Sequence, residues 1–398
     1  MHFQKSNNIK LLLCSLISIN LFANEFSLNN QEILSDTRKK SIDLSQEKAN
    51  EDSEKLKKDW VNPITYNYTK NFGEEYKNEK SVISIDQPIF RSGGIYEAIK
   101  YANSTQKYAN LEISQQRKEL IYTATNHLFL IKKTDLNIQK AKLSLMNAKI
   151  DVTRKKEQVL NGFLDSSYLD NALLTQNEAK HSLVDLKYQK QELINNFNNI
   201  SSKDYTNFSL PTLKIFNEKE YLDNNIEIKK AQADIEKKDH FKGVTQANYL
   251  PSLSAFYTYT NNHFKDGISS LDDNSQTYGL RVTVPFDIRT FNDIESKKLD
   301  YLKSKVDLQN KITDEKTYFK SKLEKISMLD DRINITKEDL NIYDSILSII
   351  YEEKEAQLKT QSDLDTLQNS QKIKVIDLKT YEIDKQIEIL SVYTKLHN

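Results

Sequence analysis

Glycine, proline and cysteine are all scarce in this chain of 398 residues, which contains seven, five and one of them. Glycine makes up roughly 7% of an average protein, so collagen-like chains, glycine-rich linkers and glycine-dependent nucleotide-binding motifs are excluded. A single cysteine excludes a disulfide scaffold. The 57 basic and 57 acidic side chains cancel, and a chain without net positive charge gives no support for nucleic-acid binding.

Charged and aromatic residues are abundant instead. Charged residues make up 29% of the chain and hydrophobic residues 38%, with a mean hydropathy of -0.67, which is too polar for a polytopic helical membrane protein. The 21 tyrosines and 16 phenylalanines are too many for a disordered tail. The composition therefore predicts a long, helix-rich, folded protein.

Residues 1–23 have the pattern of a secretory signal peptide. A basic start is followed by an apolar run, and Ala23 supplies a small residue at the expected cut. The apolar run of about 13 residues is too short to span a bilayer as a helix. Cys14 lies inside it after Leu13, where a lipoprotein signal would have a small residue. The sequence predicts export and a mature chain without cysteine.

Helix-breaking residues gather mostly in two stretches. Residues 95–161 and 286–398 contain neither glycine nor proline, so each can form a long helix. The breakers lie around 63–94 and 243–285, where apolar and polar residues alternate as in a β-strand. The alternating apolar positions are Ile64, Tyr66, Tyr68, Ile83, Ile85, Leu253, Ala255, Tyr257, Tyr259, Tyr278, Leu280, Val282, Val284 and Phe286. Two β-hairpins are therefore predicted.

The first of the long windows has apolar residues at steps of seven, the repeat of a left-handed coiled coil. Two such rows are offset by two residues, which places them about 200° apart around a helix. The rows are Phe129, Leu136, Leu143 and Ile150, and Ile131, Ile138, Leu145, Val152 and Val159. A helix with an apolar seam on each of two sides needs a neighbour on both. Repeated helices of this kind form a wall or a closed cylinder.

The second long window repeats the first at a distance of 197 residues. Its rows are Ile326, Ile333, Leu340 and Leu347, and Met328, Ile335, Ile342 and Ile349. Pro88 and Pro285, at the ends of the second and fourth predicted strands, are separated by the same 197 residues. An offset shared by helices and strand ends indicates an internal duplication.

We therefore predict two structural repeats, 24–198 and 223–398, joined by a link at 199–222. The first is expected to contain a short helix at 31–59, a hairpin at 62–90, a long helix at 95–161 and a returning helix at 167–198. The second is expected to contain a helix at 223–248, a hairpin at 251–286, a long helix at 292–358 and a returning helix at 363–396. The predicted fold class is mainly α with a small β part, built from tandem coiled-coil hairpins.

The predicted strands match transmembrane β-strands, because each has about ten residues and one apolar, tyrosine-rich face. Four strands cannot close a barrel, which needs about eight or more, and an open edge is not stable in lipid. Three chains would supply twelve strands, so a homotrimer would close the barrel. The alternative is a soluble antiparallel sheet that caps a coiled coil.

Several segments next to the predicted strands resemble motifs of the TolC family of outer-membrane efflux and secretion channels. The segment from Gln87 to Gly94, with Pro88, Phe90, Gly93 and Gly94, is similar to the family's strand-end motif. The second copy matches at Pro285 and Phe286 but lacks the glycines. Two further segments resemble the entry into the third strand and a helix start, namely Tyr249-Leu250-Pro251-Ser252-Leu253 and Asn224-Asn225-Ile226-Glu227-Ile228. The amino-terminal helix departs from the family pattern and is shorter.

This resemblance covers nearly the whole mature chain and implies a homotrimer in the outer membrane. It implies a twelve-stranded transmembrane β-barrel and a twelve-helix tunnel, or α-barrel, through the periplasm. The implied partners are outer-membrane lipid, a periplasmic adaptor (membrane fusion) protein, and an inner-membrane pump or ABC transporter. The chain would then be the passive exit duct of a tripartite efflux or type I secretion system. The alternative is a soluble periplasmic coiled-coil adaptor or structural protein, although the glycine-rich segments of adaptor β-domains are lacking here.

No enzyme pattern is present in the sequence. None of the six histidines stands at a metal-ligand spacing from another. The sequence has no nucleophile elbow, phosphate loop, zinc motif or carboxylate pair in a plausible cleft. We expect neither catalysis nor a cofactor.

The turns between each long helix and its return are the candidate functional positions. Ser167 with Asp170, and Ser362 with Asp365, each place a carboxylate three residues after a serine, as in a capping box. Ser167, Asp170 and Ser362 are the predicted caps. In the TolC family these turns form the periplasmic mouth, so Asp363 and Asp365 are candidates for a periplasmic gate. Threefold symmetry would place Asp363 or Asp365 in a cation-selecting ring. Asp365 matches the family position better, and Asp363 is the freer of the two from capping.

Overall fold

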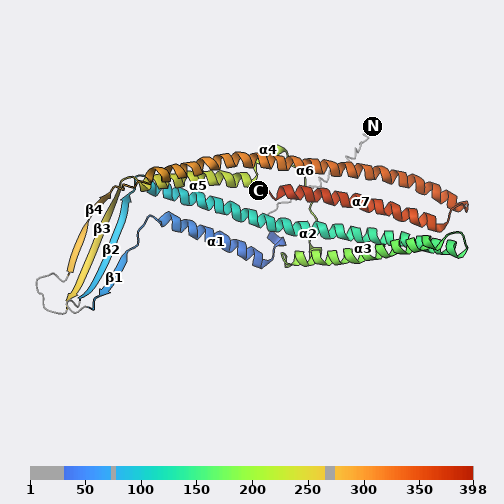
Figure 1. Ribbon diagram of the computed structural model, residues 1–398, viewed down its shortest axis with the longest axis horizontal. Helices are drawn as coiled ribbons and strands as arrows, with labels where there is room; N and C mark the ends of the chain where they lie inside the picture. The colour runs from blue at the N-terminus through green and yellow to red at the C-terminus, as the bar shows by residue number, and fades with distance from the viewer. Residues whose placement is uncertain (1–30, 73–77, 265–273, 398) are drawn as a thin grey trace, which may run out of the picture.

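The chain forms an elongated molecule with a four-stranded sheet at one end and the tips of two helical hairpins at the other (Figure 1). The computed structural model describes residues 31–72, 78–264 and 274–397. The predicted signal peptide at 1–23 and parts of both strand-connecting loops lie outside the described residues.

The described elements follow the predicted order. They are η1 (Gln31–Ile33), α1 (Asp36–Lys58), β1 (Thr65–Lys70), β2 (Asn78–Phe90), α2 (Gly94–Leu160), α3 (Ser166–Asn198), η2 (Tyr205–Asn207), α4 (Glu218–Asp223), α5 (Ile226–Asn248), β3 (Ser252–Phe264), β4 (Asn274–Thr283), α6 (Thr290–Glu355) and α7 (Gln361–Tyr393). The fold class, mainly α with four strands, is confirmed.

The strands form one antiparallel sheet in the order β1-β2-β3-β4. β2 and β3 come from different repeats and pair from Asn78 with Phe264 to Phe90 with Leu253. The register shifts between Pro88 and Phe90. Pro88 has no backbone N–H to donate to the hydrogen bonds between the strands. The central pairing joins the two repeats into one sheet.

Gly93 and Gly94 turn the chain from β2 into α2. Ser92 and Gly93 have φ angles of 46° and 86°, and glycine adopts such positive values without strain. Gly94 packs so closely on α5 that a Cβ atom there would lie 2.7 Å from the Cβ atom of Ala247. Glycine is therefore favoured at the two positions for different reasons, the positive φ angle at Gly93 and the close packing at Gly94.

The second strand-end motif turns the chain without glycine. Pro285 and Phe286 follow the end of β4, and the side chain of Asp287 accepts a hydrogen bond from the backbone N–H of Arg289 at 2.8 Å. The Arg289 side chain also pairs with Asp287 at 2.7 Å. An acidic turn residue thus replaces the glycines before α6.

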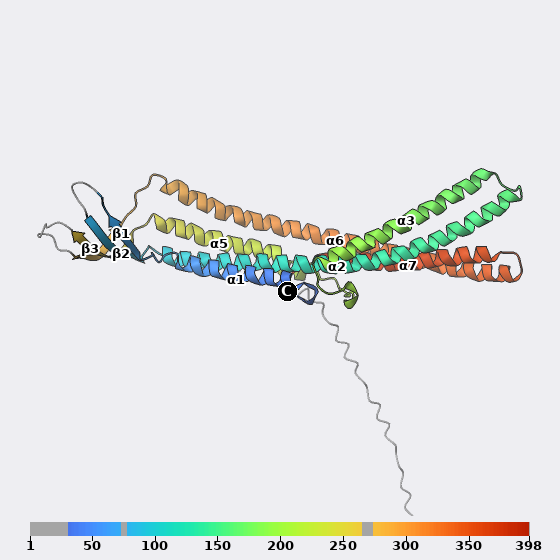
Figure 2. The same cartoon turned by 90° about the horizontal axis from the view of Figure 1, so that it is seen from below.

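The helices lie side by side in one layer rather than around a globular core (Figures 1 and 2). Across the half next to the sheet the neighbours are α1-α2-α5-α6, and across the half next to the tips they are α3-α2-α7-α6. α2 and α6, with 67 and 66 residues, each measure about 100 Å at 1.5 Å per residue. The layer has one edge at α1 and α3 and its other edge at α6.

The two long helices differ in how their apolar seams are covered. On α2, Phe129 and Ile131 belong to different seams, and both are buried because α2 has a neighbour on each side. On α6, Ile333 is 7% exposed whereas Ile335 is 59% exposed. The row Met328, Ile335, Ile342 and Ile349, here called the open α6 seam, is exposed along its length. The layer is therefore incomplete at α6.

The link between the repeats, predicted at 199–222, contains a short helix, α4, and extends to Asn225. α5 begins at Ile226 rather than at 223. The side chain of Asn225 accepts hydrogen bonds from the backbone N–H groups of Glu227 and Ile228 at 2.9 and 3.1 Å. This N-cap separates α4 from α5.

A buried carboxylate on α6 joins the link to the carboxyl-terminal segment. Glu315 is 3% exposed. It accepts hydrogen bonds from Tyr221 at 2.6 Å and Asn225 at 2.9 Å, and it pairs with Lys395 at 2.7 Å. Burial alone would raise the pKa of Glu315, but the hydrogen bonds from Lys395 and Tyr221 hold it below its ordinary value.

We expect Glu315→Gln to lower the free energy of unfolding by about 1–2 kcal/mol near neutral pH, because the amide keeps the hydrogen bonds but loses the ion pair. The folded-state pKa lies below the ordinary value of 4.5, so the ion pair stabilises the fold above that pH. This contribution is lost as the pH falls through the folded-state pKa. The difference between variant and wild type should therefore shrink in acid.

Urea unfolding followed by circular dichroism at neutral and acidic pH would measure this difference. Glu324→Gln is the control, because Glu324 lies on the same helix and is exposed, 4.0 Å from Lys320. If Glu315→Gln lowers the free energy of unfolding by the same amount at neutral and acidic pH, the charge of Glu315 does not contribute to stability.

Candidate functional site

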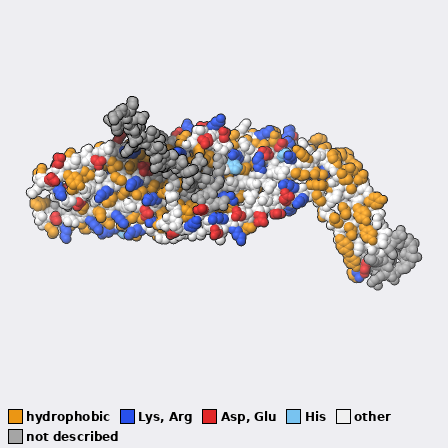
Figure 3. All heavy atoms as spheres, turned by 180° about the vertical axis from the view of Figure 1, so that it is seen from behind, with side chains coloured by type: hydrophobic (Ala, Val, Ile, Leu, Met, Phe, Trp, Pro, Cys, Tyr) orange, Lys and Arg blue, Asp and Glu red, His pale blue; other side chains and the backbone are white. Residues whose placement is uncertain are grey.

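The sheet has one apolar face. Residues paired across antiparallel strands point to the same side, and the register gathers the predicted apolar positions on one side. One row across the strands contains Tyr66, Ile83 and Tyr259, and the next contains Ile85, Tyr257 and Tyr278. Figure 3 shows hydrophobic side chains spread over the sheet end of the molecule. Tyr278 is 77% exposed, so among the described residues a large apolar surface has no cover, as at a lipid or protein interface.

The opposite face of the sheet is polar. One row runs across all four strands through Thr65, Ser84, Thr258 and Thr277. Nearer the helices, Arg281 pairs with Asp86 and lies 4.8 Å from the centre of the Phe256 ring. Hydroxyl groups and a charge pair on one face suit contact with water.

Both edges of the sheet are unpaired within the described residues. β1 pairs only with β2, and β4 only with β3. An edge strand presents a row of N–H and C=O groups that need partners, above all away from water. The sheet and the helical layer are thus both incomplete at two edges.

The tip between α2 and α3 is capped by Asp165, so the prediction that Ser167 caps it is wrong. The side chain of Asp165 accepts a hydrogen bond from the backbone N–H of Ser167 at 2.8 Å. This hydrogen bond holds the pKa of Asp165 below its ordinary value. α3 therefore begins at Ser166, and Asp170 is an exposed acid beyond the cap.

The tip between α6 and α7 is capped by Thr360, so the prediction of Ser362 is also wrong. The Thr360 side chain accepts from the backbone N–H of Asp363 at 3.2 Å, and the Asp363 side chain accepts from the backbone N–H of Thr360 at 3.1 Å. These two bonds form a capping box. Asp363 is therefore the capping acid and not, as predicted, the freer of the two acids.

Asp363 also connects the two hairpins. Its carboxylate pairs with Arg154 of α2 at 2.8 Å. Hydrogen bonds from Thr360 lower the pKa of Asp363, and the positive charge of Arg154 lowers it further. Asp365 instead accepts a hydrogen bond from Gln361 of its own helix at 2.6 Å. The two candidate acids of this tip thus have different surroundings.

The Arg154 pair is the last step of a series that the sequence reasoning missed. Four polar residues of α2 at steps of seven contact α7. The contacts are Lys133 with Asp384 at 2.6 Å, Lys140 with Asp377 at 2.6 Å, Asn147 with Asn369 at 2.8 Å, and Arg154 with Asp363 at 2.8 Å. We call this series the α2–α7 ladder. Its signal in the sequence is a set of polar residues at the same seven-residue step as the apolar rows, which becomes informative once α2 and α7 are known to be neighbours.

The described residues contain neither a membrane-spanning helix nor a metal-binding cluster. None of the helices in the described part of the chain combines the length and the hydropathy of a membrane span. Within residues 31–72, 78–264 and 274–397, no group of three or more histidine, cysteine, aspartate or glutamate side chains could hold a metal ion.

Comparison with known proteins identifies the fold. No protein-family model matches the sequence, and no curated protein matches it. The outer membrane protein VceC from Vibrio cholerae has a TM-score of 0.69 at 13% identity, over 90% of this chain and 93% of that one. The Campylobacter jejuni CmeC outer membrane channel has a TM-score of 0.69 at 14% identity, over 92% and 84%.

A third solved structure, the open state of the Neisseria gonorrhoeae MtrE outer membrane channel, has a TM-score of 0.61 at 12% identity, over 90% of this chain and 85% of that one. At these identities the similarity shows the fold. The chain has the fold of these outer-membrane channels, as its resemblance to the TolC family predicted.

Proposed function

We propose that this protein is the outer-membrane exit duct of a tripartite efflux or type I secretion system. In this role it is a passive conduit across the outer membrane and the periplasm. The observation that carries the proposal is that a chain with the fold of outer-membrane channels has a sheet and a helical layer that both end at uncovered edges.

Three copies in a ring would cover every edge. β4 of one copy would pair with β1 of the next, which gives twelve strands and a closed barrel. In the helical layer the open α6 seam would pack on the α1 and α3 edge of the next copy. That edge is also apolar in places, since Leu174, Val184 and Tyr188 of α3 are exposed. Four helices per copy would then enclose a twelve-helix tunnel.

The orientation of the barrel follows from the two faces of the sheet. The tyrosine-bearing face would contact lipid and the threonine-bearing face would line water. Lys70 and Glu79 form an ion pair at 2.7 Å on the apolar face, at the end of the strands farthest from the helices. A charge pair there is expected where the lipid-facing band ends.

The hairpin tips are the proposed docking surface for a periplasmic adaptor that connects to an inner-membrane pump. Phe163 and Leu358 occupy corresponding places in the two turns and are 78% and 74% exposed. Exposed apolar side chains at both tips favour a protein partner.

We expect the purified protein to be a homotrimer that requires detergent. Light scattering or native mass spectrometry in detergent should give three times the mass of the processed chain, because only a ring of copies covers the edges. Insertion into planar bilayers should then give ionic conductance. A monomer that stays in solution without detergent would refute the proposal and favour a soluble periplasmic adaptor or structural protein.

A further inference from the structure

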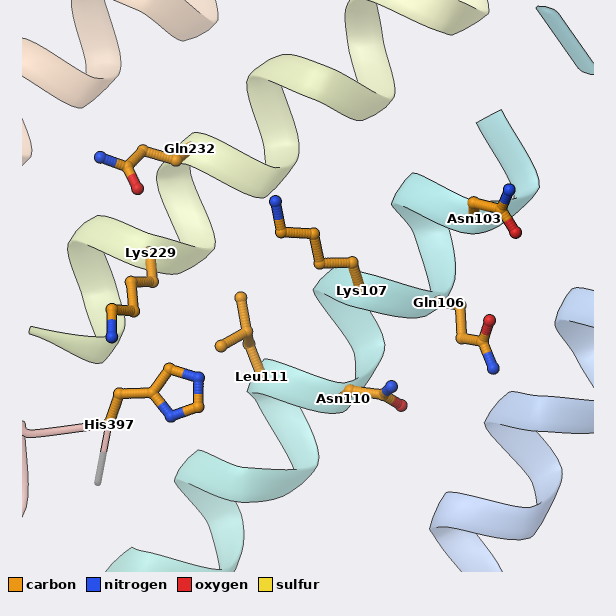
Figure 4. Close-up of a pocket in the computed structure, with 8 residues that line it drawn as sticks. All are labelled: Asn103, Gln106, Lys107, Asn110, Leu111, Lys229, Gln232 and His397. Carbon is orange, nitrogen blue, oxygen red and sulfur yellow. The ribbon is translucent and has the colours of Figure 1, made fainter. Parts of the chain in front are cut away.

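A groove between α2 and α5, close to the carboxyl-terminal segment, has an unusual set of charges (Figure 4). Its volume is about 550 Å³, and the described residues that line it supply lysine, histidine and amide side chains but no carboxylate. The chain has as many acidic as basic residues, and two other described hollows are lined by acids such as Asp185 and Asp52. The groove therefore differs from its surroundings in charge.

Three basic side chains reach the groove from three segments. Figure 4 shows Lys107 on α2, Lys229 on α5 and His397 after α7, with Leu111 between them. Lys107 pairs with Glu236 at 2.8 Å. No carboxylate of the described residues lies within 4 Å of the Lys229 ammonium group, which is half-buried. Among the described residues, the charge of Lys229 is thus not neutralised by a carboxylate.

A further lysine, Lys118, lies close enough to Lys229 for the two charges to influence each other. Lys118 is 2% exposed and donates a hydrogen bond to the carbonyl oxygen of Leu396. Burial lowers the pKa of Lys118 to about 8, and the nearby charge of Lys229 contributes to this shift. Two ammonium groups that repel each other favour the binding of an anion beside them.

We propose that the groove binds a small soluble oxyanion of the phosphate type. Lys229 would supply the main charge, and His397 and the Gln232 amide would supply further N–H donors. Lys229 lies about 30 Å along α5 from its sheet end at Asn248, counting 1.5 Å per residue. That distance separates the groove from lipid headgroups around the sheet. α2 and α5 are inner helices of the layer, so a ring joined at its edges leaves the groove open.

Protection from acylation tests this site directly. The full-length protein in detergent is treated with an acetylating ester with and without inorganic phosphate, at constant ionic strength kept with chloride, and each lysine is quantified by peptide mass spectrometry. Acetylation of Lys229 should fall about threefold when phosphate fills two thirds of the sites, because only empty sites react. Lys238, on the same helix and paired with Asp234 at 2.9 Å, should react equally in both conditions.

Matched variants keep the test independent of lysine reactivity. Phosphorus NMR lines of inorganic phosphate should broaden with the wild type and with Lys238→Gln, and should stay sharp with Lys229→Gln. Unchanged acetylation of Lys229, an equal fall at Lys238, or broadening that survives Lys229→Gln would overturn the proposal. Protection by anionic phospholipid micelles but not by phosphate would overturn the assignment to a soluble anion. None of these measurements requires ion conduction, so the site can fail while the proposed channel stands, or the reverse.

Discussion

Arginine in place of Tyr257 should strongly reduce assembly of the protein in the outer membrane, whereas arginine in place of the adjacent Thr258 should not. Tyr257 lies on the apolar face between Ile85 and Tyr278. A lipid-facing arginine near the bilayer midplane costs about 2–4 kcal/mol. A homotrimer would contain three such residues, so the cost to the assembly would be about three times larger.

Thr258→Arg is the matched control because the two residues are neighbours in β3 and lie at nearly the same depth. Thr258 is paired with Ser84 and Thr277 on the polar face, where an arginine would remain in water. The amount of folded trimer in outer-membrane fractions, and urea titrations of protein refolded in vesicles, would measure both variants. Equal yields of the two arginine variants would contradict the assignment of the tyrosine face to lipid.

The elements that could be predicted are those that depend on local pattern. The absence of glycine and proline over 95–161 allowed one uninterrupted helix, and α2 fills almost the same range. Alternation placed Tyr257 and Thr258 on opposite faces before the strand partners were known. The two-seam argument also required a neighbour on each side of a long helix. Within the described residues this holds for both seams of α2, whereas the α6 seam of Ile335 has no neighbour and is exposed.

The contacts that could not be predicted depend on which segments meet in space. Alternation does not determine that β2 pairs with β3 across the repeats. Apolar rows alone do not reveal that α2 lies beside α7, so the ion pairs of Lys133 and Lys140 with α7 were missed. Opposite charges at matched seven-residue steps are informative only once the two helices are known to be neighbours.

The predictions of the helix caps at the two tips are wrong for a local reason. Ser167 and Ser362, the predicted caps, each lie two residues after another residue that can cap a helix. These residues are Asp165 and Thr360. The choice between them depends on where the preceding turn ends. That turn contains a residue with positive φ, Gly162 at 74° in one tip and Gln357 at 60° in the other. A glutamine with positive φ is not apparent from sequence.

Releasing Asp363 from Arg154 should favour an open tip. The pair joins the α6–α7 hairpin to α2, and both side chains are partly exposed, at 40% for Arg154 and 32% for Asp363. A partly exposed ion pair of this kind stabilises the arrangement that it joins by at most about 1 kcal/mol. If three copies open together, Arg154→Gln would shift the equilibrium by up to about 3 kcal/mol, or about 100-fold towards the open state. The Thr360 capping box would remain intact, because Arg154 takes no part in it.

Single-channel recordings in planar bilayers would measure the open probability of this variant. Lys155→Gln is the control, since it removes the same charge from the adjacent position. Lys155 lies 5.7 Å from the centre of the Tyr168 ring, in the tip of its own hairpin. An open probability that rises equally in both variants, or in neither, would show that the Arg154 pair does not hold the tip closed.

Ion selectivity provides a separate test of the carboxylate ring. Because Asp363 is engaged by Thr360 and Arg154, Asp365 is the better candidate for a ring that selects cations. Asp365→Asn should weaken cation preference and block by polyvalent cations, whereas Arg154→Gln should change gating more than selectivity. Asp170→Asn removes an exposed acid from the other tip and is the control for surface charge. Unchanged reversal potentials and unchanged cation block in Asp365→Asn would contradict the ring and leave Asp365 as the hydrogen-bond partner of Gln361.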